Sequence, residues 1–90
     1  MPGQFPVKVD IQPAKAYMLP WIDGVQYVAH EHEPNVWTLY RREGGFLFSI
    51  GKASKQADNT WLATCGDQQA LKRRLKNAFK WIVQVWSETQ

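Results

Sequence analysis

Hydrophobic and polar residues alternate through two segments in the middle of the chain, Val36–Arg42 and Phe46–Ile50. Such alternation predicts β-strands, because successive side chains of a strand point to opposite faces. The segment between them, Glu43–Gly45, holds two glycines, which favour the tight turn of a hairpin. We therefore predict a β-hairpin here and, further along the chain, a third strand at Trp61–Cys65.

The hairpin has the same two faces whether its two-residue loop is Glu43-Gly44 or Gly44-Gly45, whereas a three-residue loop with a bulge would change them. One face carries mostly large apolar side chains and is the predicted core face: Trp37, Leu39, Phe46, Phe48 and Ile50, with Arg41 near the turn. The opposite face is more polar, and we expect it to be open to solvent: Thr38, Tyr40, Arg42, Leu47 and Ser49.

Near the C-terminus the period of the apolar residues changes to that of an amphipathic helix. The apolar stripe consists of Leu71, Leu75, Ala78, Phe79, Ile82 and Trp86. The spacing predicts a helix over residues 67–87, with a turn at Gly66 and Asp67 as its N-cap. The far side of this helix carries a basic strip: Lys72, Arg73, Lys76 and Lys80.

The N-terminal part of the chain predicts further strands. Residues 1–6 are rich in proline and read as a loose arm, whereas Val7–Gln12 alternates as a half-buried strand does. Ala16–Ile22 and Val25–Glu31 flank Asp23-Gly24, a favourable pair for a two-residue hairpin loop. The polar segment Lys52–Thr60 is expected to be a flexible connection.

These elements predict a single α+β domain of 90 residues: an antiparallel sheet of five or six short strands packed against one long C-terminal helix. The strands and hairpins occupy residues 7–65.

Composition narrows the class of protein only slightly. The net charge is +3 and the pI is about 9.2, which permits binding to nucleic acid without requiring it. No apolar run approaches the roughly 18–20 residues that cross a bilayer, so we expect no membrane association. The single cysteine, Cys65, cannot form an internal disulfide, and no secretion signal is evident at Met1; the cytoplasm is the expected location.

The sequence offers little catalytic or metal-binding chemistry. His30 and His32 would share one face of a strand, but the sequence marks out no third ligand beside them. Cys65 has no catalytic elbow around it and reads as a small core thiol. We therefore predict no enzymatic activity, no metal and no cofactor.

Two surfaces remain as candidates for binding. The polar sheet face could enter the major groove of duplex nucleic acid, with Thr38, Tyr40, Arg42 and Ser49 as contacts. The alternative surface is the basic helix strip of Lys72, Arg73, Lys76 and Lys80. If the sheet face binds, Arg42→Ala should weaken binding more than Lys76→Ala.

In outline, Val36–Trp86 resembles the strand-strand-strand-helix domains of phage integrase arms and of AP2-type DNA-binding proteins. This resemblance of architecture implies binding of double-stranded DNA by the sheet face. The competing interpretation is a protein-interaction module, such as an inhibitor, an adaptor or a homodimer. It would use a sheet edge around Pro20 and exposed rings such as Trp21 or Trp81.

Overall fold

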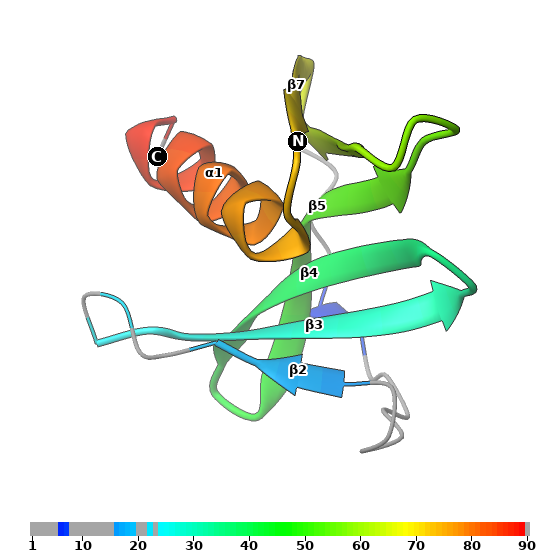
Figure 1. Ribbon diagram of the computed structural model, residues 1–90. Helices are drawn as coiled ribbons and strands as arrows, with labels where there is room; N and C mark the ends of the chain where they lie inside the picture. The colour runs from blue at the N-terminus through cyan, green and yellow to red at the C-terminus, as the bar shows by residue number, and fades with distance from the viewer. Residues whose placement is uncertain (1–5, 8–15, 20–21, 23, 90) are drawn as a thin grey trace.

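The computed structural model describes residues 6–7, 16–19, 22 and 24–89. It contains seven strands and one helix (Figure 1). The strands are β1 (Pro6–Val7), β2 (Ala16–Met18), β3 (Gln26–Glu33), β4 (Val36–Glu43), β5 (Phe46–Lys55), β6 (Trp61–Cys65) and β7 (Gln68–Lys72), and the helix is α1 (Leu75–Glu88).

The strands form one antiparallel sheet in the order β2-β3-β4-β5-β6-β7, and the short β1 pairs with β5. Each strand of the main path pairs with its neighbour in sequence, so short turns suffice to connect most of them. The sheet and the single C-terminal helix confirm the predicted α+β class. In the part of the chain that is described, no helix is long and apolar enough to cross a membrane.

The central hairpin closes through Gly44-Gly45, because Glu43 pairs with Phe46. Both glycines have positive φ, 58° and 85°, which residues with a side chain rarely adopt. The register then shifts between Leu39 and Tyr40, so that β5 carries an extra residue there. This β-bulge bends the strand, and β5 continues past the bend to pair with β6 (Figure 1).

The helix packs against one face of this bent sheet. Its buried residues are Ala78, Phe79, Ile82, Val83 and Val85. They meet small or branched residues of the strands, of which Ala29, Leu39, Ala53 and Ala63 are completely buried. Gly51 lets the helix approach closely, because an added Cβ would clash with Ile82 and would lie 2.6 Å from the carbonyl oxygen of Thr64. The predicted core face of β4 is thus the helix-facing side.

The predicted start of the helix was wrong. Gln68–Lys72 forms β7, which pairs with β6 through a tight turn at Gly66, and α1 begins only at Leu75. Asp67 therefore cannot cap the helix, whose N-cap is Arg74. Leu71, expected in the buried stripe, is 60% exposed on β7. Pairing with β6 satisfies the backbone of this segment and outweighs its helix propensity.

The prediction of a flexible connection at Lys52–Thr60 was also wrong in its first half. Lys52–Lys55 belongs to β5, where residues 52–54 pair with both β4 and β6 and Lys55 pairs with β6. The strand continues here because Ala53, between the polar residues Lys52 and Ser54, is completely buried. A tight turn follows, in which Asn59 has a φ of 67° and Asp58 accepts hydrogen bonds from Thr60.

The N-terminal predictions are tested only in part. A hairpin does join the second and third strands, since Ile22 and Val25 exchange backbone hydrogen bonds of 3.0 and 2.9 Å around a turn at Gly24. Most of the expected strand Val7–Gln12, residues 1–5 of the expected arm, and Pro20 and Trp21 lie outside the described residues. Pro6, the last residue assigned to that arm, instead belongs to β1 and pairs with Phe48. The expectation that Trp81 is an exposed ring was wrong, because it is half-buried against the core.

Two residues of the predicted core face behave differently near the hairpin turn. Phe46 is 53% exposed, because it lies next to the turn. Phe48 is half-buried beside Arg41, whose guanidinium carbon lies 5.9 Å from the Phe48 ring and 5.9 Å from that of Trp86. Arg41 also forms an ion pair with Glu43. The apolar part of this face therefore ends at Arg41, close to the hairpin turn.

Candidate functional site

The four sheet-face residues, Thr38, Tyr40, Arg42 and Ser49, differ in their access to solvent. Arg42 and Ser49 are exposed, but Thr38 and Tyr40 keep only 9% and 5% of their surface. The expectation that this face is open along its whole length was therefore wrong for its inner half. Whether any of the four contacts a partner stays a prediction.

The inner half of this face contains a small polar cluster. Val28, His30, Thr38 and Tyr40 point to the same side of β3 and β4, because Val28 pairs with Tyr40 and His30 with Thr38. His32, two residues beyond His30, lies on the same side, where its Nε2 lies 2.8 Å from the Tyr40 hydroxyl; the register shift between Glu31 and Glu33 leaves it without a partner on β4. The His30 and His32 rings meet edge to face at 4.5 Å. His32 is thus one of the groups that cover Tyr40.

Burial changes the acid–base properties of this cluster. The pKa of His32 is lowered, chiefly by desolvation and then by the charges of His30 and Lys52, while Glu33 acts in the opposite direction. Burial raises the pKa of Tyr40 above its usual value, although a hydrogen bond with Thr38 opposes this. Both shifts favour the neutral forms, which suits a structural cluster more than an acid–base centre.

Metal-binding and nucleophilic chemistry find little support. Among the described residues, no three His, Cys, Asp or Glu side chains come together as a metal site would require. Cys65 lies in the core, as predicted, and burial raises the pKa of its thiol. A raised pKa lowers the thiolate fraction and hence the reactivity of the sulfur.

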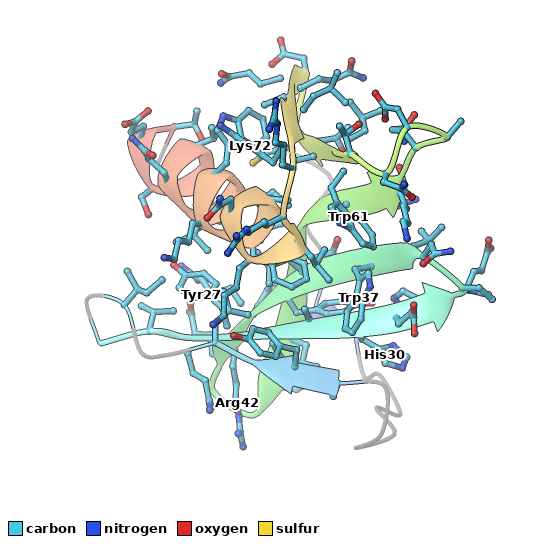
Figure 2. The ribbon with its side chains drawn as sticks, in the orientation of Figure 1. Tyr27, His30, Trp37, Arg42, Trp61 and Lys72 are labelled. Atoms are coloured by element: carbon cyan, nitrogen blue, oxygen red, sulfur yellow. The ribbon has the colours of Figure 1, made fainter. Side chains whose placement is uncertain are left out.

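The second candidate surface lies around the junction of β7 and α1. We call it the basic surface, and it consists of Lys72, Arg73, Arg74, Lys76 and Lys80. All of these side chains are exposed except Lys72, which is half-buried. The prediction that Lys72 and Arg73 lie on the helix was wrong, since Lys72 ends β7 and α1 begins only at Leu75. The prediction also missed Arg74, although the run Lys-Arg-Arg at 72–74 marks it plainly. In Figure 2 Lys72 and Arg42 lie at opposite sides of the molecule, so the basic surface and the sheet face are separate.

Positive charge is concentrated on this surface. Residues 68–87 contain five lysines and arginines and no Asp or Glu, while the rest of the chain has six basic against eight acidic residues. The remainder of the chain is thus net negative, and the whole excess comes from the C-terminal part. Within the described ranges the only ion pair is Arg41–Glu43, so the five cations have no carboxylate partner there.

The start of α1 adds to the positive field. Arg74 is the N-cap, but its side chain makes no capping hydrogen bond, and the first turn holds no acidic residue. The first backbone N–H groups of a helix carry partial positive charge, which acidic side chains usually balance. Here Arg73, Arg74 and Lys76 flank that end in the sequence instead. This arrangement is unfavourable for the isolated helix and favourable for the approach of an anion.

Comparisons with protein families, with curated proteins and with solved structures found no match to this chain, so the geometry of its surfaces is what a functional proposal can use.

Proposed function

We propose that this domain binds double-stranded nucleic acid through the basic surface, by contacts with phosphates. The observation that carries the proposal is the cluster of five cations within residues 72–80, which no described carboxylate neutralises. Phosphate contacts dominate the affinity of most nucleic-acid-binding proteins, and lysine and arginine make them. The helix N-terminus within the cluster adds backbone donors to the same surface.

The basic surface is a better candidate than the sheet face that the sequence favoured. Base reading requires side chains that reach into a groove, and Thr38 and Tyr40 have almost no free surface. Arg42 is exposed, but its Nη1 donates a 3.2 Å hydrogen bond to Gln26. Two exposed side chains near a turn offer less contact than five clustered cations.

The proposal is tested by the anisotropy of a labelled random duplex over a range of salt concentrations. Five phosphate contacts would give a slope of log affinity against log salt of about −4.5, since each contributes about −0.9. Lys76→Ala should reduce the magnitude of that slope by about one. Arg42→Ala on the sheet face and Lys55→Ala, an exposed lysine of β5, serve as matched controls and should change it little.

Two results would overturn the proposal. A larger loss of binding in Arg42→Ala than in Lys76→Ala would return the interface to the sheet face. Absence of salt-sensitive binding by the wild-type protein would remove nucleic acid as a ligand.

One observation favours a protein partner as a second candidate function. β7 is the last strand of the sheet path, and Leu71 on it is 60% exposed. An edge strand with an apolar side chain can pair with a strand of another chain. Sedimentation of the wild type should then show concentration-dependent association, and Leu71→Lys should abolish it; a monomer at all concentrations contradicts self-association.

A further inference from the structure

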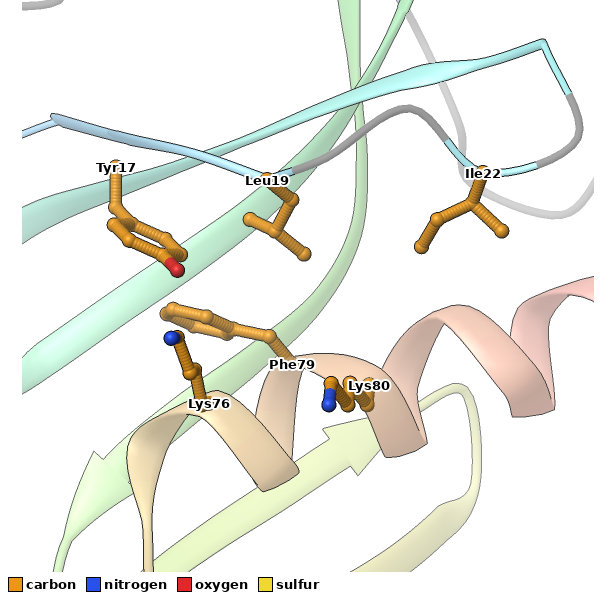
Figure 3. Close-up of a pocket in the computed structure, with 6 residues that line it drawn as sticks. All are labelled: Tyr17, Leu19, Ile22, Lys76, Phe79 and Lys80. Carbon is orange, nitrogen blue, oxygen red and sulfur yellow. The ribbon is translucent and has the colours of Figure 1, made fainter.

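A cavity of about 280 Å³ lies between the β2 side of the sheet and the helix. Figure 3 shows Tyr17, Leu19 and Ile22 projecting from one side toward Phe79 on α1. Lys76 and Lys80 complete the lining from the helix. The cavity is therefore enclosed by two separate elements and is not a depression in a single strand or helix.

The interior of this cavity is apolar. Leu19 and Phe79 are 6% and 2% exposed, so they form its floor, and the ring of Tyr17 stacks on that of Phe79 at 6.0 Å. A second hollow of about 260 Å³ shares Tyr17, Lys76 and Phe79 and extends toward Trp37 and Leu75. The apolar lining thus continues along the first two turns of α1.

The two lysines give the cavity a charged border. Lysine stems are apolar, whereas their ammonium groups stay in water, so Lys76 and Lys80 can line the cavity and still present charge at its mouth. They stand four residues apart and hence about one helical turn from each other. None of the six lining residues is acidic, and the single described ion pair, Arg41–Glu43, involves neither lysine.

From this geometry we propose that the cavity binds a small amphipathic anion, a medium-chain alkyl carboxylate. The alkyl chain lies against Tyr17, Ile22 and the apolar stems of the two lysines, above the largely buried Leu19 and Phe79, and the carboxylate meets the ammonium groups of Lys76 and Lys80. A volume of about 280 Å³ is just below the usual range for small-molecule sites, which suits a short chain and excludes a large cofactor. This site shares Lys76 and Lys80 with the basic surface, but the proposal goes beyond nucleic-acid binding and does not rest on it.

Calorimetric titration with octanoate and decanoate, kept below micelle-forming concentrations, tests the proposal. Each buried methylene should tighten binding about fourfold, so decanoate should bind up to about fifteenfold more tightly than octanoate. Decylammonium has the same chain and the opposite charge, and it should bind more weakly than decanoate. Absence of decanoate binding, or equal binding of the two decyl compounds, would overturn the proposal.

Three variants locate the site. Lys76→Gln with Lys80→Gln should weaken decanoate binding by up to about thirtyfold, the effect of two exposed ion pairs. Ile22→Trp should fill the cavity and abolish binding. Lys55→Gln, the control, should bind as the wild type does. If Ile22→Trp does not fold, as circular dichroism would show, the lysine variant decides alone; unchanged affinity in it would refute the site.

The Ile22→Trp variant separates this proposal from nucleic-acid binding, whereas the lysine variant removes cations that both proposals use. Ile22→Trp keeps every cation of the basic surface, so it should lose decanoate and keep duplex binding. If the wild-type protein binds decanoate but does not bind the duplex, the proposed nucleic-acid function is refuted and the cavity proposal is not.

Discussion

The two faces of the β3–β4 pair are both buried in part, but by different means. The helix side is covered by apolar packing, with Leu39 and Ala29 completely buried under Phe79 and its neighbours. The opposite side keeps polar groups in a buried setting, where the Tyr40 hydroxyl bonds His32 and Thr38 and the His30 ring meets that of His32. Burial by itself therefore does not identify the core of this domain.

The two kinds of burial should respond differently to substitution. Apolar packing loses transfer free energy and gains a cavity when a large side chain is removed. A polar contact in a partly hydrated cluster contributes less, because water competes for the same groups. The variants below measure that difference, beginning with the largest expected effect.

Phe79→Ala should lower the free energy of unfolding by about 3–5 kcal/mol, through lost burial and the cavity that remains. Phe79 is 2% exposed and meets both Tyr17 and Trp37, at ring distances of 6.0 and 5.9 Å. Urea denaturation measures the loss, with Asn77→Ala, an exposed change on the same helix, as the control. A loss below about 1 kcal/mol would show that the helix is not anchored by this ring.

Gly51→Ala should destabilise the protein by about 1–3 kcal/mol, as overpacking of a core does. The added methyl would clash with Ile82 and approach the Thr64 carbonyl oxygen to 2.6 Å, which cannot move without disturbing β6. Thermal unfolding compares it with Ser49→Ala, an exposed change on the same strand. Equal melting temperatures in the two variants would contradict the close approach of helix and sheet.

Tyr40→Phe, on the opposite face, should cost only about 0.5–1.5 kcal/mol for each hydrogen bond that its hydroxyl makes. The change removes the hydroxyl that bonds His32 Nε2 at 2.8 Å and that also bonds Thr38. A double-mutant cycle with His32→Gln isolates the interaction from other effects of either change. A coupling energy near zero would mean that the two side chains are neighbours without a stabilising contact.

The smallest expected effect is a loss of stability on mild acidification. The lowered pKa of His32 means that the folded protein binds fewer protons than the unfolded chain near and below pH 6.5. Stability should therefore fall as the pH decreases from 7.5 to 5.5, a range above the titration of ordinary carboxylates. Urea midpoints at the two pH values measure the fall, which His32→Gln should reduce; an identical fall in that variant would assign it to other groups.

The charge distribution offers a second contrast within the chain. Residues 68–87 carry all of the excess positive charge. The sequence prediction named both this segment and the sheet face as candidate binding surfaces. The basic residues themselves were visible from the sequence. Their grouping with an uncapped helix start was not, because the prediction extended the helix back to residue 67, with Asp67 as its cap.

The sequence by itself determined the elements whose signals are local. Gly44-Gly45 indicated a tight turn because glycine readily adopts positive φ, and both residues do so in the structure. The alternation around them set the two faces of the hairpin. The apolar spacing from Leu75 to Trp86 was sufficient to indicate a helix, since one face of it must be buried. These features depend on neighbouring residues alone.

Only the tertiary structure decided the features that depend on distant partners. Gln68–Lys72 has the composition of a helix but pairs with β6, because strand pairing satisfies its backbone groups. Tyr40 and Thr38 occupy alternate positions, as solvent-facing residues do, yet both are buried. On the same face of the sheet, the neighbouring strand β3 places His30 and His32 beside them. The cavity at Phe79 likewise exists because β2 and α1, some sixty residues apart in the chain, pack against each other. Local patterns carry no information about such pairings, since their free energy comes from contacts between segments far apart in sequence.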